Sequence, residues 1–161
     1  MAEQWFLKLD GIAGASTADG HAGEIDVLSW SWGVHHTGAT AVGSGAAGSK
    51  TDFDDFHLVA RIGVASPQLF LACATGTHVK TAELTGARVT GKGKATPFLT
   101  YKLSDVLVTA IEHGDADSGP PIEQFALAYS KIEMTYVPQK SSGKLGTPAH
   151  AGFDVKQNKA V

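Results

Sequence analysis

The stretch Gly23-Glu-Ile-Asp-Val-Leu-Ser-Trp-Ser-Trp-Gly33 has the clearest strand pattern in the chain. Ile25 and Val27 share one side of a period-2 alternation, and from Leu28 onward the apolar residues change to the other side. A slip of one residue in such a pattern predicts a β-bulge near Val27–Leu28. After the slip, the residues predicted to face the core are Leu28, Trp30, Trp32 and Val34.

Alternating apolar residues predict further strands on both sides of this stretch. The predicted strands cover residues 5–10, 24–34, 53–62, 77–90, 97–112 and 123–137. Two of the long strands lose their phase, near Ser104–Asp105 and at Ser130–Lys131, and such slips favour a sheet that bends enough to close. The 19 glycines of the chain are typical of many strands joined by tight turns.

One helix is predicted, over residues 66–75. Ser66 is a suitable N-cap, Pro67 suits the first helical position, and Gly76 follows the end. A helix of about ten residues is marginal alone, so its apolar stripe must pack on the sheet. That predicted stripe consists of Leu69, Phe70, Cys73 and Ala74.

Residues 35–51 contain almost no side chain that could build a core. A loop this long is usually functional or disordered, and we predict a projecting arm that becomes ordered on contact with a partner. From Pro138 the chain is rich in Gly, Pro and Lys, and residues 138–161 are predicted to be a loosely packed C-terminal segment. The length of 161 residues favours a single domain over 1–161. The predicted fold is mostly β, an antiparallel β-barrel of two packed sheets with a short flanking α-helix (66–75) and a long extended loop (35–51).

Composition and charge exclude several classes of protein. The net charge is −3 and no block of five like charges occurs, which argues against nucleic-acid binding and against a polybasic membrane arm. No apolar run approaches the roughly 18 residues of a membrane-spanning helix. The N-terminus has an acidic residue where a signal peptide has basic ones, so we expect folding in the cytoplasm. The single cysteine, Cys73, excludes an internal disulfide.

No motif predicts catalysis, a cofactor or a metal. Gly43-Ser-Gly-Ala-Ala-Gly48 matches G-x-G-x-x-G, but a strand follows it instead of the helix that would hold phosphate. The seven histidines lack zinc-site spacing, and the acidic groups lack the ligand pattern of a calcium loop. Cys73 lies on the apolar stripe of the predicted helix, where a buried thiol is more common than a nucleophile. No Gly-x-Ser-x-Gly elbow occurs. The prediction is therefore a protein that is not an enzyme and needs no cofactor.

Several segments, taken in order along the chain, resemble the Hcp (hemolysin-coregulated protein) family, the tube proteins of bacterial type VI secretion systems. They are residues 23–33 quoted above, Ser66-Pro-Gln-Leu-Phe-Leu-Ala-Cys-Ala-Thr-Gly-Thr-His78, Asp105-Val-Leu-Val108, Glu123 followed by Lys131-Ile-Glu-Met-Thr-Tyr-Val-Pro-Gln139, and Gly152-Phe-Asp-Val-Lys-Gln-Asn158. Together they extend over nearly the whole chain. Where the family commonly has Gly-Glu-Ser, this chain has Gly14-Ala15-Ser16, so a subunit contact made by that Glu does not carry over.

The resemblance implies a structural subunit that forms hexameric rings. The rings would stack into the type VI inner tube, which a contracting sheath expels together with its spike, and small effectors would be carried in the ring lumen. Ser29 and Ser31 would face the lumen and its cargo. The residues implied in ring stacking are Thr40, Val42, Gly43, Ser44, Gly45 and Lys50. Assembly would take place in the cytoplasm, and secretion through the apparatus would follow without a signal peptide. The resemblance implies neither nucleic-acid binding nor insertion into a membrane.

Two other functions are compatible with the residues alone. The first is a monomeric β-barrel that carries a small apolar ligand, with Trp30 and Trp32 lining an interior pocket. The second is an enzyme with an unrecognised site, for which the sequence nominates no catalytic group.

Overall fold

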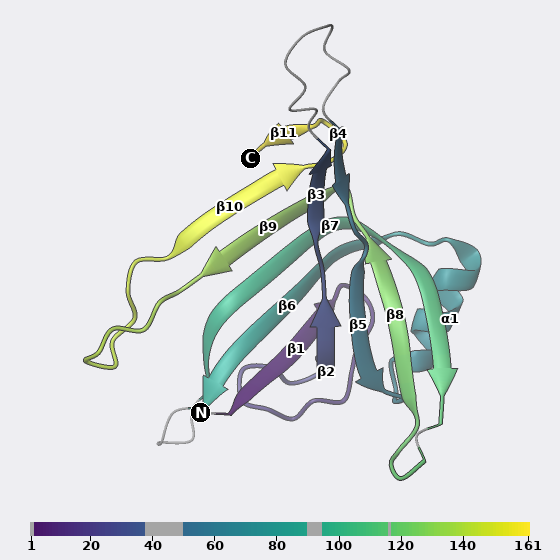
Figure 1. Cartoon of the computed structure of the whole chain (residues 1–161). Helices are drawn as coiled ribbons and strands as arrows, with labels where there is room; N and C mark the ends of the chain where they lie inside the picture. Colours follow the sequence, from purple (N-terminus) through teal and green to yellow (C-terminus); the bar gives the residue numbers. More distant parts are fainter. Residues whose placement is uncertain (1, 38–49, 90–94, 116) are drawn as a thin grey trace, which may run out of the picture.

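The structure is a computed structural model that describes residues 2–37, 50–89, 95–115 and 117–161. Its elements are β1 (Glu3–Leu9), β2 (Ile25–Ser31), β3 (Val34–Thr37), β4 (Lys50–Phe53), β5 (Phe56–Arg61), α1 (Ser66–Thr75), β6 (Val79–Val89), β7 (Ala95–Gly114), β8 (Ile122–Ala128), β9 (Lys131–Tyr136), β10 (Ala149–Asp154) and β11 (Lys159–Ala160). Figure 1 shows strands that curve around a common centre, with α1 on one side.

A closed barrel forms because β7 pairs with both ends of a run of strands. The sheet order is β7-β6-β1-β2-β5-β8, and β8 pairs back onto β7. Every strand pairing in the described part of the chain is antiparallel. The predicted antiparallel barrel with a flanking helix is confirmed, and its sheet is continuous around the six strands.

The 20-residue strand β7 also carries an extension of the sheet. Its first half, from Leu99 to Ser104, pairs with β9 on the edge opposite β6. Its second half, from Leu107 to Gly114, pairs with β8. The sheet therefore branches at β7, and β9, β10 and β11 leave the barrel on one side (Figure 1).

Each predicted phase slip coincides with an irregularity in the sheet. The pairing of β2 with β5 shifts between Val27 and Ser29, which confirms the predicted bulge. Asp105 has a positive φ of 52° where β7 loses its alternation. The strand predicted over 123–137 is two strands, β8 and β9, with Ser130 between them. At these points the sheet changes direction or partner.

The predicted core face of residues 28–34 is only partly correct. Trp30 and Trp32 pack against the core as expected. Leu28 is 49% exposed because it is the extra residue of the bulge, and Val34 is 45% exposed because it belongs to β3, beyond the barrel.

An aromatic cluster fills one end of the barrel interior. Phe56 is 1% exposed, and its ring lies 5.3 Å from the ring of Tyr101 and 5.6 Å from that of Trp30, centroid to centroid. The ring of Trp5 contacts Trp30 at 5.0 Å. Aliphatic side chains complete the core, among them Leu7, Leu58, Leu84, Leu103, Val106, Val108 and Leu127.

Helix α1 has the predicted bounds but a different buried face. Gly76 has a φ of 65° and ends the helix in a left-handed conformation, as predicted. Ser66 does not cap the helix; it is buried, and its Oγ accepts a hydrogen bond from the Gly63 amide at 2.9 Å. Leu69 and Ala72 share the buried face with Ser66, so Phe70, predicted to be in the stripe, is turned outward and 59% exposed. The start of the helix thus fixes which row of side chains meets the sheet.

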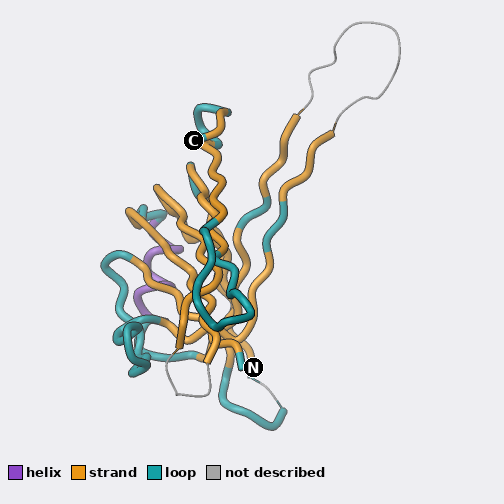
Figure 2. Tube along the Cα trace, turned by 90° about the vertical axis from the view of Figure 1, so that its left-hand side faces the viewer, coloured by secondary structure: helices purple, strands orange, loops and turns teal. Residues whose placement is uncertain are grey.

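The predicted loop 35–51 begins and ends as strands. Val34 pairs with Phe53 and Thr37 with Lys50, so β3 and β4 form a two-stranded ribbon, called the arm here. Figure 2 shows that the arm stands away from the barrel. The predicted stacking residues Thr40, Val42, Gly43, Ser44 and Gly45 lie outside the described residues.

The C-terminal segment adds two strands to the sheet extension. β10 pairs with β9 from Ala149 to Asp154, and β11 pairs with the end of β10. Most of their side chains remain exposed or half-buried. No helix in the described ranges is long and apolar enough to cross a membrane.

Candidate functional site

The arm is a continuation of the β2–β5 hairpin beyond the rim of the barrel. The chain passes from β2 to β3 through Trp32 and Gly33, and from β4 to β5 through Asp54 and Asp55. The Asp54 amide donates a hydrogen bond to the Gly33 carbonyl at 3.0 Å. The two chain segments therefore stay together where the arm begins, although no strand pairing is assigned there.

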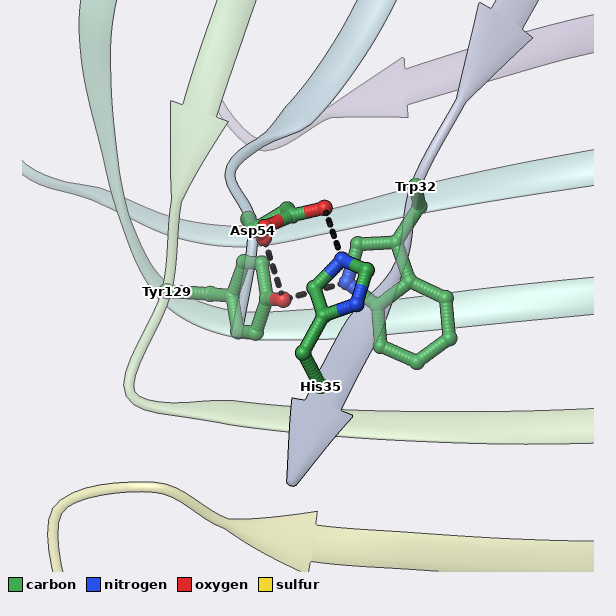
Figure 3. A network of polar contacts seen from close by, with 4 residues as sticks. All are labelled: Trp32, His35, Asp54 and Tyr129. Carbon is green, nitrogen blue, oxygen red and sulfur yellow. Dashed lines mark hydrogen bonds and ion pairs between the residues drawn. The ribbon is translucent and has the colours of Figure 1, made fainter. Parts of the chain in front are cut away.

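A network of polar contacts holds the base of the arm (Figure 3). Trp32 Nε1 donates to the Tyr129 hydroxyl at 2.5 Å, and that hydroxyl donates to the Asp54 carbonyl at 2.7 Å. His35 Nε2 lies 3.2 Å from Asp54 Oδ2. Tyr129 lies between β8 and β9, so one hydroxyl group ties both segments of the arm to a third part of the chain.

The Tyr129 hydroxyl is held in its protonated form. Burial raises its pKa, the carboxylates of Asp55 and Asp54 raise it further, and the hydrogen bond from Trp32 lowers it, with a net value of about 12. The group therefore keeps the proton that it donates to the Asp54 carbonyl throughout the neutral range.

Two more contacts connect the arm base to the sheet. Thr109 Oγ1, on β7, donates to Asp55 Oδ2 at 2.6 Å. The ring of Phe53, the last residue of β4, stacks on the ring of Phe153 in β10 with centroids 5.1 Å apart. The arm is thus attached to the barrel wall on one side and to the sheet extension on the other.

The predicted lumen residues are placed on the same hairpin as the arm. Ser29 and Ser31 lie on β2 and are both exposed, and Ser31 is paired with His57 of β5. Lys50 is the first residue of β4, paired with Thr37. The structure therefore places the two serines on the barrel wall and Lys50, predicted to take part in stacking, on the arm.

Sequence reasoning missed Tyr129 and Asp54 as site residues. The available signal was the break in alternation at Ser130, next to Tyr129, which marks a change of strand partner. Within the described residues, no three His, Cys, Asp or Glu side chains are grouped so that they could hold a metal ion.

Replacing Tyr129 with phenylalanine (Tyr129→Phe) should lower the free energy of unfolding by about 0.5–1.5 kcal/mol at pH 7. The half-buried Trp32 N–H would lose its acceptor, whereas the exposed Asp54 carbonyl can bind water instead, so the loss is that of an ordinary hydrogen bond. Equilibrium unfolding in urea measures the change. Tyr136→Phe is the matched control, because Tyr136 is 38% exposed. Equal losses in both variants would contradict a role of the network.

The same variant gives a pH test with a defined sign. The folded pKa of Tyr129 is about 12 against 10.0 for an unperturbed tyrosine. The stabilisation is complete below pH 10 and is lost as the pH rises towards 12, since the unfolded chain releases the proton first. The difference in stability between wild type and Tyr129→Phe should therefore shrink across this window.

Comparisons with known proteins agree with this architecture. A family model described as "Type VI secretion system effector, Hcp" matches residues 6–136. The chain is 32% identical to Protein hcp1 of Pseudomonas aeruginosa over 160 residues, 98% of each chain. The crystal structure of Hcp1 from Salmonella typhimurium is 33% identical, covers 100% of both chains and superposes with a TM-score of 0.83. A solved type six secretion system protein gives a TM-score of 0.89 at 29% identity, over 99% of this chain and 100% of that one. The barrel, its projecting arm and these matches together show that the chain belongs to the Hcp family of type VI secretion proteins.

Proposed function

We propose that this protein is a structural subunit of the type VI inner tube. Six copies form a ring, and the rings stack into a tube that sheath contraction expels. The observation that carries the proposal is the arm, which projects from the barrel but is fixed at its base by Tyr129 and Phe153. A subunit that must hold its neighbours in register needs such a fixed projection, and membership of the Hcp family supports this role.

The individual residues have separate tasks in this proposal. Ser29 and Ser31 face the ring lumen and its effectors, where small neutral side chains give a weakly binding wall. Residues 40–45 and Lys50 reach the next ring. The partners are further copies of this chain, the sheath, the spike and effector proteins. In this proposal the role of the subunit is structural and not enzymatic. The subunits assemble in the cytoplasm and are exported through the secretion apparatus.

Native mass spectrometry and electron microscopy of the purified protein test the proposal. A six-fold ring is the expected result, and a monomer at all concentrations would overturn it. A reconstruction of the ring at side-chain resolution would also locate Ser31. A position on the outer surface would remove the lumen assignment while the ring itself remained.

Deleting residues 39–48 should leave rings intact and reduce stacking into tubes. The contacts at the base of the arm lie outside this segment, so the fold should survive. Many subunits share each layer, and a weak contact repeated around a ring has a large combined effect. Electron microscopy should show single rings where wild type shows tubes. A control that replaces residues 39–48 by a Gly/Ser segment of equal length separates the loss of side chains from the loss of reach. Unfolded protein would contradict the prediction.

The packing counts against the carrier alternative. That function requires Trp30 and Trp32 to line a ligand pocket inside the barrel. Their rings instead pack against Phe56 and Tyr101.

A further inference from the structure

The charge of the chain is divided unevenly along its length. Residues 131–161 carry five lysines against two acidic residues, whereas residues 1–130 carry fourteen acidic residues against eight basic ones. The first group is the sheet extension of β9, β10 and β11, called the flap here. The flap is therefore a basic element attached to an acidic barrel.

The flap also exposes apolar side chains beside its lysines. Met134 and Tyr136, on β9, are each 38% exposed, and Leu145, in the loop between β9 and β10, is 53% exposed. Lys140 and Lys144 form the turn of that loop, where the Lys140 amide donates to the Lys144 carbonyl at 2.8 Å. Both lysines are exposed, and neither has an ion pair within the described ranges.

A second mixed surface lies around α1. Val64, Phe70 and Leu71 are 64%, 59% and 58% exposed. Ile62 and Phe70 line a shallow recess together with Gly63, Ser66, Pro67 and His113. The Ile62 amide donates to the Pro121 carbonyl at 3.0 Å, which joins this surface to the β7–β8 connection.

The connection beside α1 is acidic. Glu112, Asp115 and Asp117 are exposed near the end of β7, and the described residues offer none of them a basic partner. We call Ile62, Val64, Phe70 and Leu71, with these three acids, the helix side. In Figure 1 the flap strands β9 and β10 lie on the opposite side of the barrel from α1.

We propose that the flap of one subunit docks onto the helix side of the next subunit, and that this contact closes the ring. The inference rests on the proposed ring and identifies its two contact surfaces. Both surfaces expose apolar side chains, and they carry opposite charges, so that Lys140 and Lys144 of one subunit face Asp115 and Asp117 of the next. A stable interface takes roughly 20–30 residues on each side, and the flap supplies a segment of that size.

The contact is head-to-tail because the two surfaces differ. A two-fold dimer through the flap would bring the lysines of two copies together, which costs Coulomb energy. Two different surfaces on opposite sides of a subunit instead generate a ring when the rotation between copies closes.

Charge reversal tests the contact. The flap variant carries Lys140→Glu and Lys144→Glu, and the helix-side variant carries Asp115→Lys and Asp117→Lys. At a concentration where wild type is fully hexameric by native mass spectrometry, each variant should lose the ring, because like charges now meet. A chain with all four changes should regain it. A 1:1 mixture of the two variants should also form rings, in which the two kinds of subunit alternate.

Controls separate the possible failures. Lys8→Glu with Lys80→Glu changes the net charge as the flap variant does, outside both surfaces, and should stay hexameric. Rings formed by the mixture show that both variants are folded. If wild type forms hexamers and both reversed variants do as well, the flap contact is wrong and the tube proposal stands. If the variants lose rings that neither mixing nor the combined chain restores, the contact is also wrong. A monomeric wild type would remove the proposed function itself.

Discussion

Replacing Phe56 with alanine (Phe56→Ala) should lower the free energy of unfolding by about 3–5 kcal/mol, the range found for removal of a fully buried aromatic ring. Phe56 is 1% exposed and contacts the rings of Trp30, Trp32 and Tyr101. Three rigid rings around one site cannot all move into the space, so a cavity should remain. Typical domains are stable by about 5–15 kcal/mol, and the loss is a large fraction of that range.

Urea unfolding followed by tryptophan fluorescence measures this effect, since Trp30 and Trp32 flank the substituted ring. Protein concentration must be the same for all variants, because assembly stabilises the folded state by mass action. Phe153→Ala is the matched control. It removes the same side chain from a half-buried position with one ring contact, on Phe53, and should cost clearly less. Equal costs would mean that the cluster collapses around the missing ring.

Replacing Gly86 with alanine (Gly86→Ala) should cost about 1–3 kcal/mol, as overpacking of a filled site does. A Cβ atom at Gly86 would lie 2.6 Å from Cη2 and 2.9 Å from Cε3 of Trp5, which is paired with Gly86 across β1 and β6. The indole cannot swing aside easily, since its ring also contacts Trp30 at 5.0 Å and Phe98 at 5.6 Å.

Gly114→Ala provides the comparison for this prediction. A Cβ atom at Gly114 would meet no heavy atom within 4 Å, and its φ is not positive. Alanine there should leave the thermal midpoint nearly unchanged, while Gly86→Ala lowers it by several degrees. A Gly86→Ala protein as stable as wild type would show that Trp5 has another position of similar free energy.

The barrel could be predicted from sequence because the patterns that indicate its strands lie within short segments of the chain. Alternation marked the strands, and each phase slip marked a bulge, a positive φ or a change of partner. The closure of β8 onto β7 left no such mark, since it depends on which strands meet in space. β10 was missed as a strand because Ala149–Asp154 has little alternation, and the open edge of β9 supplies its hydrogen bonds.

The site was less predictable than the fold. Tyr129 bonds to residues 97 and 75 positions earlier in the chain, a relation that no local pattern contains. The wrong assignment of Phe70 has a related cause. The helix pattern allowed more than one apolar row, and the buried Ser66 selects the row through its bond to Gly63. The single-domain boundary and the roles of Ser29 and Ser31 stay predictions.

The pairing of Thr37 with Lys50 has a consequence for how sequences of this kind can diverge. The contacts that fix the arm are made by this pair and by residues nearer the barrel. The pair therefore closes a loop between positions 37 and 50, and the contacts of the barrel do not depend on that loop. Doubling the length of a closed segment costs only about 0.6 kcal/mol of chain entropy. Insertions and replacements between positions 37 and 50 should therefore be tolerated by the barrel. This makes the segment a natural place to graft a foreign peptide.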